Sequence, residues 1–149
     1  MKGILGVGNL LMKDEGFGVH VVRQIHETGA LPPEVELMDG GTAGMALMSF
    51  FQQCRHVLVI DIINLDKEPG TLVSFSRQDF AGIVRTQRTS PHQIGILDIL
   101  EILDLEDSAP QVDFMCAVPK EISEGLELSP PLRQAAARAA GLAVEWARN

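Results

Sequence analysis

Basic residues, aromatic residues and cysteine are all scarce in this chain of 149 residues. Twelve Lys and Arg stand against twenty Asp and Glu, which gives a net charge of −8 at pH 7. Binding to nucleic acid or to an anionic membrane surface requires clustered Lys and Arg, so this acidic balance argues against both kinds of partner. Tyrosine is absent, which removes the phenol as a catalytic acid.

The two cysteines, Cys54 and Cys116, stand outside any C-x-x-C pattern. Neither a disulfide framework nor a thiolate zinc site is therefore indicated, and we expect both thiols to be reduced and buried. No hydrophobic run approaches the ~20 residues that a spanning helix needs, and the start lacks the apolar stretch of a signal peptide. The sequence predicts one soluble cytoplasmic domain over residues 1–149, with a monomer as the default state.

Several common catalytic and cofactor motifs are missing as well. Gly6-Val7-Gly8-Asn9-Leu10-Leu11 follows an apolar run like a dinucleotide loop, but Leu11 replaces the third glycine of G-x-G-x-x-G. There is no phosphate-loop motif, no G-x-S-x-G and no H-E-x-x-H. We therefore expect no nucleotide cofactor, no serine nucleophile and no zincin site.

Short apolar runs alternate with longer helical patterns along the chain. Strands are predicted at 4–7, 35–38, 57–60, 72–75 and 111–118, and helices at 16–28, 43–54, 91–104 and 130–148. This alternation indicates an α/β fold with a mainly parallel, doubly wound sheet. Ligands of such sheets bind beyond the carboxyl ends of the strands.

Three polar residues are predicted to lie at that edge. Glu15 precedes the first helix, Asp61 follows the third strand, and His92 lies in the first turn of a helix that Ser90-Pro91 begins. Each has an ordinary explanation: complementing a helix dipole, ending a strand, or facing solvent beside a cap. Together, two carboxylates and an imidazole form a donor set for an open divalent-metal site, whereas the lack of thiolates argues against a tight structural zinc site.

The protonation state of His92 and the surroundings of the other residues can also be predicted. A helix N-terminus disfavours imidazolium, so we expect His92 to be neutral, as a metal ligand must be. In the ordinary interpretation, Asp14 caps the first helix. His20, His26 and His56 are expected at the surface.

Glycines mark two further places where we expect a special backbone arrangement. Gly16 and Gly18 weaken the start of a helix, which suggests that the backbone there comes into close contact with a neighbouring group. The second glycine loop, Asp39-Gly40-Gly41-Thr42-Ala43-Gly44, either exposes backbone N–H groups to a bound peptide or is only a tight turn between a strand and a helix.

An ordered series of motifs runs along nearly the whole chain and resembles the [NiFe]-hydrogenase maturation endopeptidases. The segments are Gly6 to Val19, Asp39-Gly40-Gly41-Thr42-Ala43-Gly44, Val59-Ile60-Asp61, Pro69-Gly70-Thr71, Ser90-Pro91-His92-Gln93 and Leu128-Ser129-Pro130. The resemblance implies a three-layer α/β/α sandwich. It also implies an enzyme that removes the C-terminal extension of a hydrogenase large-subunit precursor after nickel has been inserted.

The same resemblance assigns roles to residues. It implies that Glu15, Asp61 and His92 bind metal, that the nickel is the precursor's own, and that Asp39 shapes the cleft. An alternative from another class is a non-catalytic accessory protein that uses the same three ligands to pass nickel to a partner. A nucleotide-binding module is a third possibility, which Leu11 opposes.

Overall fold

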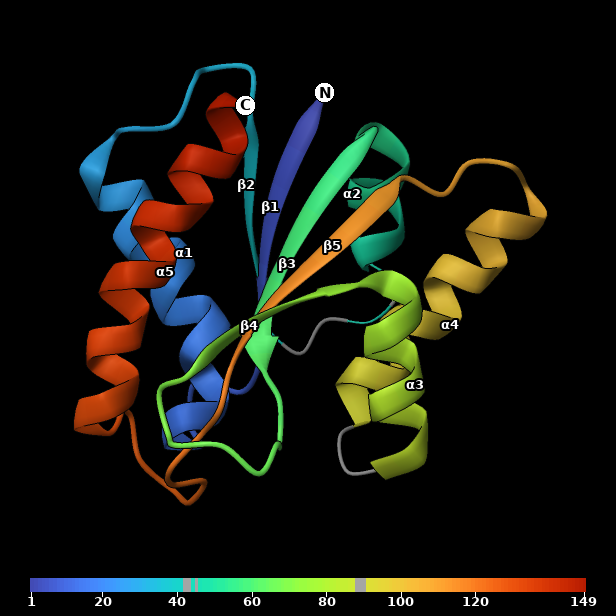
Figure 1. Cartoon of the computed structure of the whole chain (residues 1–149). Helices are drawn as coiled ribbons and strands as arrows, with labels where there is room; N and C mark the ends of the chain where they lie inside the picture. The colour runs from blue at the N-terminus through green and yellow to red at the C-terminus, as the bar shows by residue number, and fades with distance from the viewer. Residues whose placement is uncertain (42–43, 45, 88–90) are drawn as a thin grey trace.

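The computed structural model describes residues 1–41, 44, 46–87 and 91–149. Five strands form one twisted sheet in the spatial order β2-β1-β3-β5-β4 (Figure 1). β1, β2, β3 and β5 are parallel, and β4 at the edge runs antiparallel to β5. The predicted mainly parallel sheet is confirmed. The strands are Lys2–Val7 (β1), Glu36–Gly41 (β2), His56–Ile62 (β3), Leu72–Ser76 (β4) and Gln111–Ala117 (β5).

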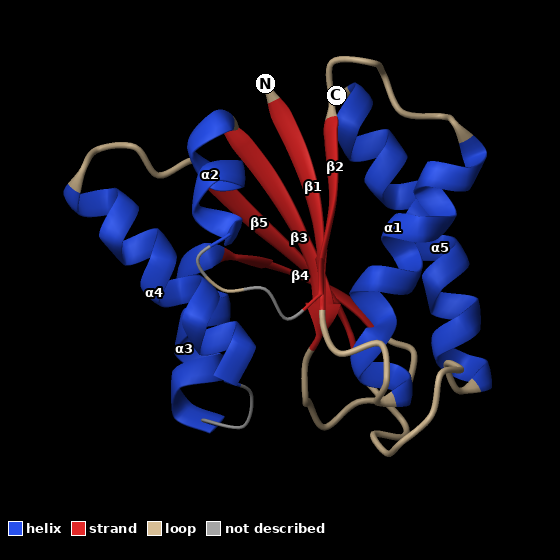
Figure 2. Cartoon of the chain, turned by 180° about the vertical axis from the view of Figure 1, so that it is seen from behind, coloured by secondary structure: helices blue, strands red, loops and turns tan. Residues whose placement is uncertain are grey.

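Helices cover both faces of this sheet and make the fold a three-layer α/β/α sandwich (Figures 1 and 2). α1 and α5 lie on one face, and α2, α3 and α4 lie on the other. Within the described ranges, no helix is long and apolar enough to cross a membrane. The helices are a 3-10 turn at Lys13–Gly16 (η1), Phe17–Thr28 (α1), Ala46–Gln53 (α2), Arg77–Gln87 (α3), Pro91–Leu105 (α4) and Pro130–Arg148 (α5).

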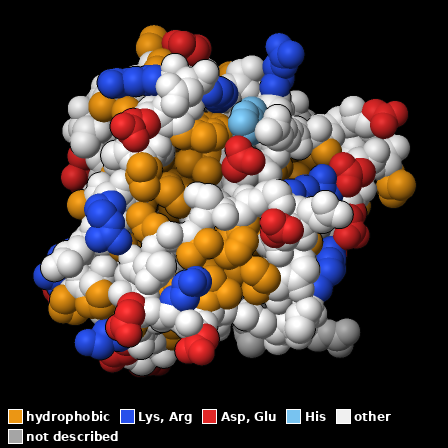
Figure 3. Space-filling view, viewed as in Figure 1, with side chains coloured by type: hydrophobic (Ala, Val, Ile, Leu, Met, Phe, Trp, Pro, Cys, Tyr) orange, Lys and Arg blue, Asp and Glu red, His pale blue; other side chains and the backbone are white. Residues whose placement is uncertain are grey.

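The sheet separates two hydrophobic clusters. On one side, Phe17 and Ile25 of α1 pack with the alanines of α5 against the sheet. On the other side, the rings of Phe80 and Phe114 stack with their centroids 3.8 Å apart. In the view of Figure 3, apolar side chains gather in the middle of the face, and Lys and Arg are scattered among acidic side chains.

The structure differs from the predicted elements in two places. α3 was not predicted, because only Phe80 and Val84 of its residues are buried and Gly82 interrupts its helical pattern. β2 continues to Gly41, because Asp39 and Gly41 still pair with Gly6 and Val7 of β1. In both places, contacts with neighbouring elements outweigh local preference.

Two glycines allow α1 to begin directly on the backbone of the sheet. A Cβ atom on Gly18 would lie 2.1 Å from the carbonyl oxygen of Ile60, and one on Gly6 would lie 2.1 Å from that of Gly18. The close approach predicted for the first glycine-rich segment is confirmed. Its partner is the protein's own strands, and it brings η1, which carries Glu15, to the end of β3.

Candidate active site

Three elements bring the predicted site residues together at the carboxyl end of the sheet. Nε2 of His92 lies 2.9 Å from Oδ2 of Asp61, and Nδ1 of His92 lies 3.8 Å from Oε1 of Glu15. The imidazole at the start of α4 therefore lies between a carboxylate from η1 and one from β3. Exposure decreases along this row, with 25% of the Glu15 side chain accessible, 11% of His92 and 1% of Asp61.

Two cavities meet at this row of side chains, and Glu15 and Pro91 line both of them. The larger has a volume of about 400 Å³, and His92 lies in its wall. The smaller has a volume of about 210 Å³ and contains more polar groups. Among the described residues, its other lining residues are Ile62, Ile63, Asn64, Gln87, Gln93 and Ile122.

Both carboxylate oxygens of Asp61 already have partners within the protein. Oδ1 accepts a hydrogen bond from the backbone N–H of Ile62 at 2.8 Å. Oδ2 accepts one from the Gln93 amide at 3.0 Å, besides its contact with His92. Gln93 also donates to the Ile62 carbonyl at 2.7 Å, so its amide nitrogen joins α4 to the end of β3. Asp61 is therefore held rigidly at the bottom of the site.

Gln93 is a residue whose role the sequence did not reveal. Its position after Ser90-Pro91 fits a helix-capping pattern, and the Ser90 side of that pattern lies outside the described residues. The structure uses its amide nitrogen to hold Asp61. The available signal was a long polar side chain next to His92, in the first turn of the predicted helix.

The pKa of His92 is shifted in the direction opposite to the one that the helix N-terminus predicts. Burial alone would lower the pKa of the imidazole, but its hydrogen bond to the Asp61 carboxylate, the charge of Asp61 and the charge of Glu15 together raise the pKa above its ordinary value of 6.5. Two nearby carboxylates thus outweigh the helix dipole. The surroundings therefore favour the imidazolium form more than the sequence predicts.

Over the described part of the chain, no three His, Cys, Asp or Glu side chains converge on one point as metal ligands. The reason is visible at Asp61, whose Oδ2 is engaged by His92 and Gln93. The pair Glu15 and His92 fits a metal better, because one ion with bonds of about 2.0–2.2 Å to oxygen and nitrogen can bridge atoms 3.8 Å apart.

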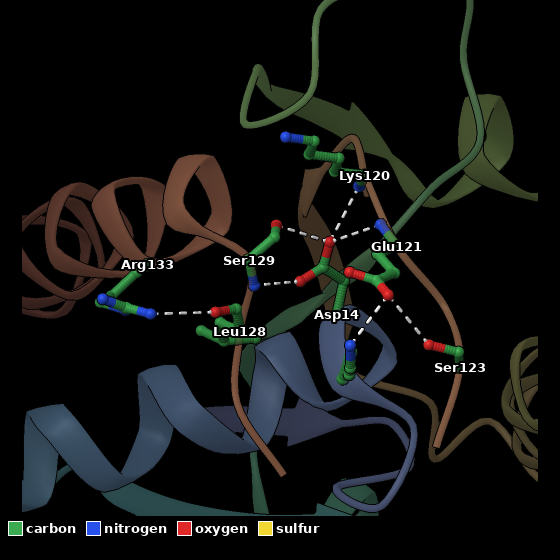
Figure 4. A network of polar contacts seen from close by, with 8 residues as sticks. Asp14, Lys120, Glu121, Ser123, Leu128, Ser129 and Arg133 are labelled. Carbon is green, nitrogen blue, oxygen red and sulfur yellow. Dashed lines mark hydrogen bonds and ion pairs between the residues drawn. The ribbon is translucent and has the colours of Figure 1, made fainter. Parts of the chain in front are cut away.

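Asp14, next to Glu15, is a fully buried structural acid (Figure 4). Its carboxylate accepts hydrogen bonds from the backbone N–H groups of Lys120 and Glu121, and from both the N–H and the hydroxyl of Ser129. Its interpretation as the cap of the first helix is wrong, since α1 has no side-chain cap. Asp14 instead fixes the segment between β5 and α5 against η1.

The described residues of the second glycine loop lie in two places: Asp39 is apart from the three site residues, whereas Gly44 lines the larger cavity with Glu15 and His92. The Asp39 carboxylate lies 3.8 Å from the Arg23 guanidinium and lines a separate cavity of about 310 Å³ between α1 and β2. Gly41 has a positive φ of 50°. Gly40 is needed for another reason, because a Cβ there would lie 2.8 Å from the Leu5 side chain. Thr42 lies outside the described residues.

The remaining histidines and the two cysteines lie outside the row Glu15–His92–Asp61. His26 is exposed as predicted, but His20 and His56 are half-buried, and His56 contacts Asp113 at 2.6 Å at the opposite end of the sheet. Both cysteines are free and buried, as expected. Cys116 is paired with Asp61 in the register of β3 and β5, and burial, together with the charge of Asp61, raises its pKa well above the ordinary value.

Fold and site together define an α/β/α protein with a carboxylate–imidazole–carboxylate row where two cavities meet, at the carboxyl edge of a mainly parallel sheet. A sequence model described as hydrogenase maturation protease matches residues 19–146. The chain therefore belongs to the hydrogenase maturation protease family.

Individual relatives are similar to this chain over most of its length. The hydrogenase expression/formation protein HupD of Bradyrhizobium diazoefficiens is 32% identical, covering 96% of this chain and 78% of that protein. The hydrogenase 2 maturation protease of Escherichia coli is 33% identical, covering 85% and 78%. HupD of Rhodobacter capsulatus is 38% identical over 72% of this chain, and the matched stretch spans about half (51%) of that protein.

Solved structures show the same fold. The hydrogenase maturating endopeptidase HybD from Escherichia coli superposes with a TM-score of 0.90 at 29% identity, covering 99% of this chain and 91% of that one. The [NiFe] hydrogenase maturation protease HybD from Thermococcus kodakarensis gives a TM-score of 0.79 at 27% identity, with 98% of each chain covered.

Proposed function

We propose that this chain is an endopeptidase that removes the C-terminal extension of a [NiFe]-hydrogenase large-subunit precursor after nickel insertion. The observation that carries this proposal is the row Glu15–His92–Asp61 where two cavities meet, in a member of the hydrogenase maturation protease family. The named proteases and endopeptidases among the relatives support the same reaction.

In this proposal the nickel is part of the substrate, and Glu15, Asp61 and His92 recognise it. Glu15 and His92 face the cavities, so they are the groups that a nickel ion held in the precursor meets first. Thiolates bind nickel more readily than carboxylates do, so a nickel held by precursor cysteines would be contacted without being extracted. Cleavage would then depend on correct metal loading.

Asp61 has a second part in this proposal. While its Oδ2 contacts Nε2 of His92, it orients the ring as the carboxylate partner of a metal-binding histidine does. For Asp61 to contact nickel directly, the imidazole has to move away from Oδ2 and the proton between them has to leave. Binding of the nickel centre is then coupled to the release of a proton.

The proposal is tested by measuring the intact mass of purified precursor, with and without nickel, after incubation with this protein. We expect a shortened precursor only when nickel is present. Glu15→Gln, Asp61→Asn and His92→Ala should each abolish shortening while the circular dichroism spectrum stays unchanged. Glu124→Gln, an exposed acid outside the site, is the matched control and should process normally.

The outcomes separate the three functions that the sequence left open. Full processing by all three site variants would refute the assigned roles. An unchanged precursor mass with nickel transferred to or from this protein would show a nickel carrier and refute the endopeptidase. A thermal shift with nucleotides would instead point to the nucleotide-binding alternative.

A further inference from the structure

One face of α4 extends the site away from the sheet. The row on this face begins at His92 and continues with Gly95, Ile96 and Ile99, which lie three, four and seven residues after it. These spacings place all four residues on the same side of a helix. All four line the larger cavity, of about 400 Å³. One wall of this cavity is therefore a helical row that begins at a site residue, and the other described lining residues are Glu15, Gly44 and Pro91.

Gly95 is the residue in this row that keeps the cavity wide. A Cβ atom there would meet nothing within 4 Å, and Gly95 is not among the glycines with positive φ. Neither backbone conformation nor close packing requires a glycine, although glycine in a helix costs roughly 0.5–1 kcal/mol relative to alanine. Gly82 and Gly141 share these properties, and Gly95 differs from them in its place, one helical turn from His92.

The chemistry of the cavity wall indicates what fits there. Ile96 and Ile99 form apolar walls, and among the described lining residues the charged or titratable groups are Glu15 and His92, at the end nearest the site. A polar side chain pushed along this wall would lose hydrogen bonds to water without replacement. An aliphatic side chain would instead gain buried apolar contact.

The smaller cavity indicates the path along which a peptide would cross the site. It shares Glu15 and Pro91 with the larger one but presents Asn64, Gln87 and Gln93. An extended peptide held at Glu15 and His92 would therefore place neighbouring residues in two different environments, one apolar and one polar.

On the basis of the proposed function, we propose that Gly95, Ile96 and Ile99 form a specificity subsite that takes a large aliphatic side chain of the precursor next to the scissile bond. Gly95 sets the size of the side chain that is accepted. Ile96 and Ile99 select for its apolar character.

The test is a size exchange between the protein and its substrate. Gly95→Leu fills the cavity and replaces a glycine in a helix, so its thermal midpoint should stay the same or rise. We expect processing of nickel-loaded precursor to fall by about tenfold or more, mainly through KM. Gly82→Leu, in α3, makes the same replacement away from the site and should process at the wild-type rate.

Precursor variants complete the exchange. The residues on either side of the cut are replaced by alanine one at a time. At one position alanine should slow the wild-type protein, and the same alanine should restore part of the activity of Gly95→Leu. Gly95→Ala should lie between wild type and Gly95→Leu, which keeps the test decisive if the leucine variant does not fold.

Each result bears on a different claim. If the wild-type protein shortens the precursor and Gly95→Leu does so equally fast, the subsite is refuted and the proposed function stands. If Gly95→Leu slows every precursor variant by the same factor, the size-exchange argument is refuted as well. If the wild-type protein shortens no nickel-loaded precursor, both proposals fall.

Discussion

Gln93 holds the deepest carboxylate of the site in place. Its amide donates to Asp61 and to the Ile62 carbonyl, and it is 5% exposed. Removing the amide leaves two buried acceptors with one donor fewer each. Such losses cost about 1–3 kcal/mol for each unsatisfied buried group.

We therefore predict that Gln93→Met lowers the free energy of unfolding by about 1–3 kcal/mol and slows nickel-dependent processing. Urea denaturation measures the first effect, and the rate of precursor shortening at a temperature where the variant is folded measures the second. Gln87→Met is the control, because Gln87 lines the smaller cavity as Gln93 does, and its amide donates to an exposed carbonyl, that of Asn64. Equal effects of the two substitutions would contradict the role of Gln93.

The surroundings of His20 lower the pKa of its imidazole. Burial lowers this pKa below 6.5, partly offset by a hydrogen bond with the Leu126 backbone, and the charge of Arg23 lowers it further. Among the described residues, its buried Nε2 atom has no hydrogen-bond partner. Protonation is then easier in the unfolded chain, so the stability that neutral His20 contributes is present above about pH 6.5 and is lost as the pH falls through the lower folded value.

The prediction is that the loss of stability between about pH 7.5 and 5.5 is smaller in His20→Gln than in the wild-type protein. Denaturation curves at the two pH values measure it. His26→Gln, on the exposed side of the same helix, should keep the full wild-type loss. A pH dependence of His20→Gln identical to wild type would show that His20 does not contribute.

At the scale of elements, the segment between β5 and α5 depends on one buried carboxylate. Asp14 accepts four hydrogen bonds from residues 106 to 115 positions away, and these bonds place Ser129 at the start of α5. The same contacts hold η1, and with it Glu15, against this segment. The position of a site residue therefore depends on a neighbour that faces away from the site.

Asp14→Asn should lower the free energy of unfolding by about 2–3 kcal/mol, because the amide NH2 group replaces an oxygen that accepts from backbone N–H groups, which can only donate. Chemical denaturation gives the value. Asp66→Asn, at an exposed loop position, should change it by less than about 0.5 kcal/mol. If both variants are equally stable, the network around Asp14 contributes little.

At the scale of the whole molecule, the active end and the chain ends lie apart. The site is at the carboxyl end of the parallel strands, whereas both termini lie where those strands begin (Figures 1 and 2). The two hydrophobic clusters lie on either side of the sheet. The reactivity of the two buried thiols measures how this interior becomes exposed, because Cys116 lies within a strand and Cys54 lies just after the end of α2.

We predict that Cys116 reacts with an aromatic disulfide reagent only as fast as the molecule unfolds globally, because it is fully buried and burial raises its pKa. Cys54 should react faster through local opening at the end of α2. Labelling kinetics of Cys54→Ser and Cys116→Ala assign the two rates. Labelling of native Cys116 as rapid as that of a small thiol would contradict the prediction.

The sequence by itself determined the order of the five strands and of α1, α2, α4 and α5, the mainly parallel sheet, and the meeting of Glu15, Asp61 and His92 at one edge. These follow from local signals: apolar runs, Pro91 and Pro130 at helix starts, and polar residues at strand ends. Because parallel strands share a carboxyl edge, local patterns suffice to predict where their ends meet.

Only the tertiary structure decided the roles of Asp14 and Gln93, the raised pKa of His92, the helix α3 and the separate place of Asp39. Each depends on partners that are distant in sequence. The charge of an imidazole follows from which carboxylates surround it, and a buried acid is structural or reactive according to which donors reach it. Such partners are fixed by the packing of whole elements, which no local pattern contains.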